Sequence, residues 1–175
     1  QSGFLIPRIQ DNSTTGLSLN LPYFIAIAEN KDITLNPRFF AEDKLLFQTE
    51  FRQKNRNSDH IVDLSQYISN GENVKGHIFY NLNSNFENDN FDEVEFNIQL
   101  EQVSDETYLK AYKIESPIIN NTSNLTNSVG ISLINENSSL NTNLDIYEDL
   151  SKQDSDKYEY VPNFSFSKIL SENNT

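Results

Sequence analysis

The segment LSLNLPYFIAIAENKDITLNPRFF (residues 17–40) predicts two β-strands joined by a short turn. Apolar side chains recur at every second position on both sides of the polar link AENKD (28–32), which is the period of a strand with two unlike faces. Each strand carries a proline, Pro22 or Pro37, and Pro7 repeats the feature upstream. Proline lacks an N–H and is normally excluded from strand interiors, so three successive prolines in strands require a physical reason.

The same alternation continues along the chain and predicts about nine or ten strands, with no helical pattern of 10–15 residues between them. The acidic stretch FENDNFDE (86–93) is expected to be a loop, and DETYLKAY (105–112) is expected to hold a helical turn. The further predicted strands are LLFQTEFRQ (45–53), SDHIVDLSQYIS (58–69), VKGHIFYNLNSNF (74–86), EVEFNIQLEQV (93–103), LTNSVGISLIN (125–135), LNTNLDIYEDL (140–150) and VPNFSFSKI (161–169).

This pattern predicts an all-β fold, built as an antiparallel up-and-down meander with one apolar and one polar face. Two architectures satisfy it. A sandwich or barrel in water buries the apolar face, whereas a transmembrane β-barrel turns that face to lipid around a polar lumen. The polar side of residues 93–101 carries three glutamates, an asparagine and a glutamine. These side chains suit a wet lumen and an exposed sheet face equally, so periodicity leaves both architectures open.

Composition and motifs argue against several classes of function. The formal charge is −13, from 13 Lys+Arg against 26 Asp+Glu, so no basic face for nucleic acid is expected. Cysteine is absent. His60 and His77 lack metal-pair spacing, and we expect both on the polar faces of their strands. The acidic stretch 87–93 lacks the glycine and distal glutamate of a calcium loop. We therefore expect no cofactor, no metal and no enzymatic activity.

Short motifs, in their order along the chain, carry a resemblance to a known family. The opening motifs are SGFLIP (2–7), GLSLNLPYF (16–24), NKDITLNPRF (30–39) and FQTEFR (47–52), and looser ones are EQVSDETYL (101–109) and YVPNFSFS (160–167). Together they resemble the start of the β-barrel in LptD, the LPS-assembly outer-membrane protein family also called organic solvent tolerance protein. The family usually has a tryptophan after its Pro-Tyr-Tyr motif, whereas this chain has none.

The resemblance implies that residues 1–175 form one segment of a larger barrel, namely its opening strands. The expected function is part of a translocon that inserts lipopolysaccharide into the outer leaflet of a Gram-negative cell outer membrane. Pro7 and Pro22 match family prolines at a lateral gate between barrel strands, where missing N–H groups weaken the seam. Pro37 matches another family proline, for which we expect a local bulge or kink. The partners implied are lipopolysaccharide, an LptE-like plug lipoprotein and an LptA-like periplasmic bridge.

The alternative is a soluble all-β surface or carbohydrate-binding module. It requires Leu19, Tyr23, Phe96 and Ile98 to lie in a dry core between sheets. The barrel interpretation requires these residues in an outward apolar band, with Glu95 and other polar side chains on the opposite face.

Overall fold

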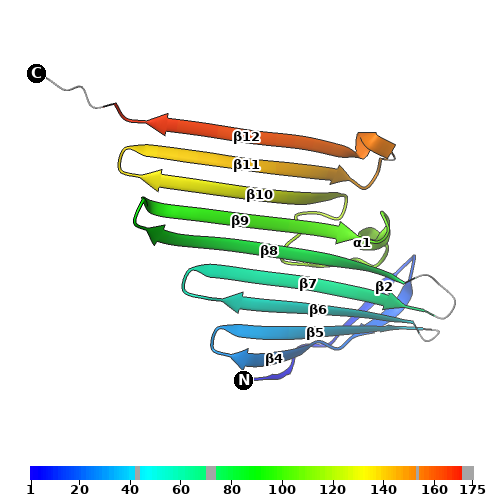
Figure 1. Ribbon diagram of the computed structural model, residues 1–175. Helices are drawn as coiled ribbons and strands as arrows, with labels where there is room; N and C mark the ends of the chain where they lie inside the picture. Colours follow the sequence, from blue (N-terminus) through cyan, green and yellow to red (C-terminus); the bar gives the residue numbers. More distant parts are fainter. Residues whose placement is uncertain (42–43, 70–73, 153, 171–175) are drawn as a thin grey trace, which may run out of the picture.

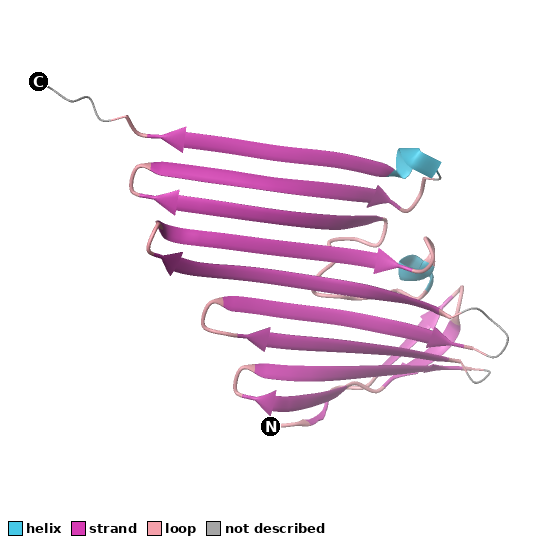
Figure 2. Cartoon of the chain, viewed as in Figure 1, coloured by secondary structure: helices cyan, strands magenta, loops and turns pink. Residues whose placement is uncertain are grey.

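A computed structural model describes residues 1–41, 44–69, 74–152 and 154–170, with the side chains of 154 and 155 left out. The chain forms one antiparallel, open sheet in which each strand from β4 to β12 pairs with the next along the sequence (Figure 1). Helix is confined to two short pieces at one end of the sheet (Figure 2). The predicted all-β antiparallel meander is therefore confirmed, with the form of part of a β-barrel wall.

The strands are β1 (Gly3–Phe4), β2 (Arg8–Asn12), β3 (Gly16–Asn20), β4 (Tyr23–Ala28), β5 (Lys31–Phe40), β6 (Leu45–Lys54), β7 (Ser58–Ile68), β8 (Lys75–Asn88), β9 (Phe91–Val103), β10 (Asn124–Asn135), β11 (Ser138–Asp149) and β12 (Tyr158–Lys168). The helical pieces are α1 (Tyr108–Ala111), which confirms the expected helical turn, and the 3₁₀ turn η1 (Asp154–Lys157).

Two predictions of local structure were wrong. The acidic stretch 86–93 is mostly strand, because β8 runs to Asn88 and β9 begins at Phe91. The Asn88 side chain accepts the N–H groups of Asn90 and Phe91, which closes the turn within very few residues. The predicted strand over residues 17–27 is divided into β3 and β4 at Leu21–Pro22.

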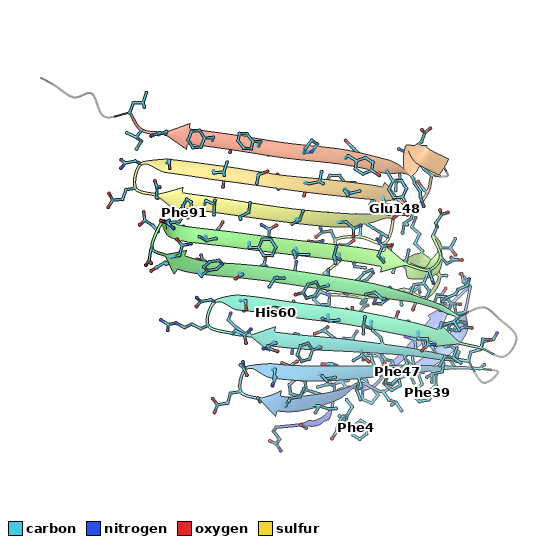
Figure 3. The ribbon with its side chains drawn as sticks, viewed as in Figure 1. Phe4, Phe39, Phe47, His60, Phe91 and Glu148 are labelled. Carbon is cyan, nitrogen blue, oxygen red and sulfur yellow. The ribbon has the colours of Figure 1, made fainter. Side chains whose placement is uncertain are left out.

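The register gives the sheet one apolar and one polar face, because directly paired residues project to the same side. The apolar face is open: Phe39 is 46% exposed, Ile78 62% and Leu100 47%. Figure 3 shows Phe39 and Phe47, which belong to the paired strands β5 and β6. The polar face repeats Asn, Ser, Gln and Glu, as in the paired row Asn81, Gln99, Ser128 and Asp145.

The exposure pattern contradicts the soluble-module alternative. Leu19 is 38% exposed and pairs with Phe39 on the open apolar face. Tyr23, Phe96 and Ile98 are half-buried on that same face, with no second sheet packed over them among the described residues. The residues that this alternative places in a dry core therefore form part of an outward apolar band.

The buried core lies on the opposite, polar side, at one end of the sheet. There the link between β9 and β10, residues 104–123, folds back over the sheet, and we call it the covering segment. Its apolar side chains pack on buried residues of β6–β8; the cluster comprises Leu46, Tyr67, Phe79, Tyr108, Leu109, Tyr112, Ile114, Ile118, Leu125 and Leu150. Within the described ranges, neither helical piece has the length and hydropathy needed to cross a membrane.

Candidate functional site

The prolines of the opening strands lie along a line where the sheet ladder is interrupted. We call Pro7, Pro22 and Pro37 the proline line. The first break, at Leu5–Pro7, separates β1 from β2, and the second, at Leu21–Pro22, separates β3 from β4. Both β3 and β4 pair with the unbroken strand β5, which contains Pro37. The prolines thus fall on adjacent strands rather than at unrelated places.

Pro37 removes one hydrogen bond at this line. The Leu21 N–H donates to Pro37 O at 3.0 Å. In an antiparallel hydrogen-bonded pair the two residues exchange two such bonds, but the return bond here needs the N–H that proline lacks. The register of β5 against β6 runs without a shift through Pro37, so the structure has no bulge at this residue.

Pro22 has the same effect one strand further toward the edge. The Leu5 N–H donates to Pro22 O at 2.9 Å, and the return bond is again impossible. Pro22 is buried, while Pro7, in the break of the edge strand, is exposed. Before the break Phe4 pairs with Tyr23, and after it Arg8 pairs with Asn20. The register of the edge strand against its neighbour therefore shifts by one residue across the break.

Apolar side chains continue across the proline line on the outer face. Phe4 packs edge-on against Tyr23 at 4.8 Å between ring centroids, and Figure 3 shows Phe4 at the lower edge of the sheet. Ile6 is 83% exposed within the first break. The part of the sheet that lacks these ladder hydrogen bonds therefore also exposes apolar side chains.

The polar side of the line is hollowed. A cavity of about 720 Å³ lies between the hairpin of β2 and β3, strands β5 and β6, and the covering segment. Arg38 lines it, is 7% exposed and donates from Nη1 to Tyr112 O at 2.5 Å. Arg38 Nε and Asn20 Oδ1 are buried and find no hydrogen-bond partner among the described residues. The cavity thus combines polar atoms of the sheet with apolar residues of the first break.

A buried polar chain holds the covering segment to the sheet. Ser65 Oγ lies 2.6 Å from both the Tyr108 hydroxyl and His77 Nδ1. His77 Nε2 lies 3.2 Å from Asp63 Oδ1, outside hydrogen-bond geometry, and Gln48 Nε2 donates to both Asp63 carboxylate oxygens at 3.0 Å. The serine, histidine and carboxylate are enclosed beneath Tyr108, so this arrangement is suited to anchoring rather than to contact with a substrate.

Burial shifts the pKa of one residue that anchors the segment, and a hydrogen bond shifts that of another. It raises the pKa of the Tyr108 phenol to about 12, even though the Ser65 hydroxyl favours the phenolate. The Thr107 hydroxyl holds the pKa of Asp105 below its usual range. Asp105 also pairs with Lys75 of β8 at 3.4 Å. A neutral phenol and a charged carboxylate therefore both tie the start of the segment to the sheet at neutral pH.

The sequence analysis located some of these residues and missed others. His77 lies on the polar face as expected, but His60 lies on the apolar face, between Ser58 and the Tyr80 hydroxyl, so that prediction was wrong. The covering segment was expected only to contain a helical turn. Its six large apolar residues within a link between strands were the available signal. Over the described ranges, no group of acidic, histidine or cysteine side chains is arranged to hold a metal ion.

Comparison with known proteins identifies the family. The model of the family described as "LptD: LPS transport system D" matches residues 83–174, more than half of the 175-residue chain. LPS-assembly protein LptD of Pseudomonas aeruginosa (strain UCBPP-PA14) is 41% identical over 63 residues, covering 36% of this chain and 7% of that protein. The LptD of Sodalis glossinidius is 28% identical over 119 residues, covering 62% of this chain and 15% of that protein.

The LptD of Pseudoalteromonas atlantica is 24% identical over 109 residues, covering 62% of this chain and 14% of that protein. The chain therefore spans only about a seventh or less of the length of the curated relatives that it matches. The chain belongs to the LptD family.

Proposed function

We propose that this chain supplies opening wall strands of an outer-membrane translocon that inserts lipopolysaccharide into the outer leaflet, and that the proline line forms one side of its lateral gate. The observation that carries the proposal is the ladder that lacks return bonds at Pro22 and Pro37 beneath an open apolar face. The relatives are named LPS-assembly proteins, which supports lipopolysaccharide as the proposed substrate.

The two faces match the two halves of such a substrate. Strands β8 to β11 each have 12 to 14 residues, enough to cross the roughly 30 Å hydrocarbon layer when tilted. The apolar face would meet lipid, and the Asn-, Ser- and Gln-rich face would meet the hydrated sugars in the lumen. Acyl chains then require a sideways exit through the wall, since a polar lumen does not solvate them.

The proline line offers such an exit at low cost. Each absent ladder bond removes roughly 0.5–1.5 kcal/mol of net stabilisation, and more where water is excluded. Pro7 and Pro22 belong to the edge strand and its neighbour, so they weaken the pairs that must separate first. Pro37 lies one strand further in and removes a bond between the broken strand and the first continuous one.

The ends of the sheet support an orientation. The turns at 29–30, 89–90 and 136–137 are tight, whereas the link at the other end between β9 and β10 is the long covering segment. In bacterial barrels the short turns face the periplasm and the longer loops face outward. In this orientation the β2–β3 hairpin lies at the outer end, where the substrate leaves.

The proposal includes transport without catalysis. Energy and delivery would come from other components, namely an LptA-like periplasmic bridge, with an LptE-like lipoprotein as the plug of the complete barrel. These partners follow from membership of the family rather than from any surface of this chain. The location proposed is the cell outer membrane of a Gram-negative bacterium.

The test replaces Pro7 and Pro22 together by alanine in the complete protein, which supplies two new N–H donors. We expect slower lipopolysaccharide delivery to the cell surface and greater entry of large antibiotics. Pro162→Ala is the matched control, because Pro162 lies within β12, far from the proline line. Normal delivery and normal antibiotic exclusion by the double variant would contradict the gate.

A further inference from the structure

The β2–β3 hairpin contacts the covering segment directly, although about a hundred residues separate them in sequence. Asn12 Nδ2 donates to Ala111 O at 2.8 Å, and Lys113 Nζ donates to Asp11 O at 3.4 Å. Arg8 Nη1 forms an ion pair with Glu115 Oε2 at 3.1 Å. These three contacts run along one side of the hairpin, from its base to its tip.

The same short stretch of the covering segment is held to the sheet on its other side. Gln48 Nε2 of β6 donates to Glu115 O at 2.9 Å, and Arg38 of β5 donates to Tyr112 O. Between these two points Lys113 adopts φ 47°, in the left-handed region that side-chain-bearing residues rarely occupy. Such a conformation persists only where surrounding contacts hold it, and here contacts on both sides do so.

The hairpin has few other attachments. Strand β3 pairs with β5 only through Ser18–Phe40, Leu19–Phe39 and Asn20–Arg38. After Asn20, the return hydrogen bonds at Pro22 and Pro37 are missing. The backbone hydrogen bonds of β4 therefore do little to fix the position of β3. The contacts with the covering segment are therefore as numerous as the residue pairs that join the hairpin to the sheet.

We infer that the covering segment is a strap that sets the position of the β2–β3 hairpin. The strap is anchored on the continuous strands β6–β8 by Tyr108, Gln48 and the buried core. It contacts the hairpin at Asn12, Asp11 and Arg8, which lie on the edge side of the proline line. The hairpin can therefore move only when these contacts are released. The covering segment, which is distant in sequence, thus determines whether the edge of the sheet can move. For the consequence in transport, this inference rests on the proposed gate function.

Hydrogen–deuterium exchange on the complete protein in detergent micelles tests the strap. Asn12→Asp removes the Nδ2 donor of the best-formed contact but keeps the oxygen that accepts the Thr14 N–H within the hairpin turn, and we expect amides of residues 16–20 to exchange about threefold to tenfold faster. Amides of β10 and β11 should keep their rates. Ser13→Ala is the control, because Ser13 is exposed on the same hairpin and makes none of the strap contacts.

Charge reversal provides a second and independent variant. Arg8→Glu should accelerate exchange of the hairpin by up to about fivefold, since exposed ion pairs contribute little individually. The double variant Arg8→Glu with Glu115→Arg should restore the original rate. Unchanged hairpin exchange in both Asn12→Asp and Arg8→Glu would overturn the strap.

Lipopolysaccharide delivery, measured on the same variants, separates the two proposals. Faster hairpin exchange with altered delivery supports both the strap and the gate. Faster exchange with normal delivery supports the strap and counts against the gate. Unchanged exchange refutes the strap whatever the delivery, and leaves the gate to the proline variants.

Discussion

The two ends of this sheet are built from similar residues but differ in how their strands are joined. From β8 to β11 the ladders are long: β10 and β11 stay in register from Asn124–Asp149 to Asn135–Ser138 without a shift. At the opening end the ladders are short, because β1 and β4 share two residue pairs and β3 and β5 share three. Alternating side chains are sufficient for a wall, whereas Pro22 and Pro37 decide where ladder hydrogen bonds are missing from it.

The difference also concerns what holds each end in place. The continuous strands are held by their backbone ladders and, on the polar side, by the core beneath the covering segment. The opening hairpin is held both by its short pairing with β5 and by side-chain contacts to that segment. The predictions below alter the continuous end, the opening end or the segment that joins them.

The largest expected effect is the loss of the core that anchors the continuous end. Phe79 is fully buried and stacks on His77 with ring centroids 4.1 Å apart. Phe79→Ala should lower the free energy of unfolding by about 3–5 kcal/mol through lost burial and the cavity left behind. Denaturant titration of the complete protein in micelles measures it. Phe164→Ala on the exposed face of β12 is the reference, and an equal loss there would contradict the buried core.

The next effect compares one glycine from each end. A Cβ at Gly76 in β8 would collide with the Ser65 backbone oxygen, whereas a Cβ at Gly3 in β1 meets nothing within 4 Å. Gly76→Ala should therefore destabilise the protein by about 1–3 kcal/mol, because backbone must move to relieve the overlap. Gly3→Ala should change stability by less than about 0.5 kcal/mol. The same denaturant titration distinguishes them, and similar values would show that the two ends are equally tolerant.

A smaller effect concerns the Tyr108 anchor and is sensitive to pH. Tyr108→Phe removes the hydrogen bond to Ser65 and should cost about 0.5–1.5 kcal/mol. Because the folded-state pKa is raised to about 12 from 10, the neutral phenol contributes stability below pH 10 that is lost as pH rises toward 12. Unfolding midpoints between pH 9 and 12 should fall more steeply in the original protein than in Tyr108→Phe. Parallel pH profiles would contradict this.

The smallest expected effect restores the missing bonds at the opening end. Pro37→Ala provides an N–H opposite Leu21, and the new bond is offset in part by the greater freedom of the unfolded chain. The net change in stability should stay within about 1 kcal/mol. Exchange of the Leu21 amide should nevertheless slow, because its own bond then belongs to a complete pair. Pro117→Ala, in the covering segment, should leave this amide unchanged.

Much of the fold was predictable because alternation has a period of two and leaves little ambiguity. The stretch 93–101 alternates without interruption, and β9 covers it. The errors arose where turn chemistry or proline outweighed the pattern. The Asn88 side chain closes a tight turn, so the acidic residues on either side of it remain in β8 and β9. The Leu21–Pro22 break divides a run in which every odd-numbered residue from 17 to 27 is apolar.

The covering segment could not have been predicted in the same way. Tyr108, Leu109 and Tyr112 show neither strand nor extended helix periodicity, and their burial depends on the polar face that they meet. Ser65, His77 and Asp63 come together only because β7 and β8 pair in one particular register. Likewise, Asn12 and Ala111 are so far apart in sequence that no local pattern predicts their contact.

Side-chain alternation, proline positions and short motifs were sufficient to establish the class of fold, its two unlike faces and its family, because each depends on local periodicity or on residue identity. The tertiary structure decided which face stays open, how Pro22 and Pro37 interrupt paired strands, and where the covering segment holds the hairpin. Those features depend on register and on long-range contact, and register is selected by the whole sheet rather than by any one strand.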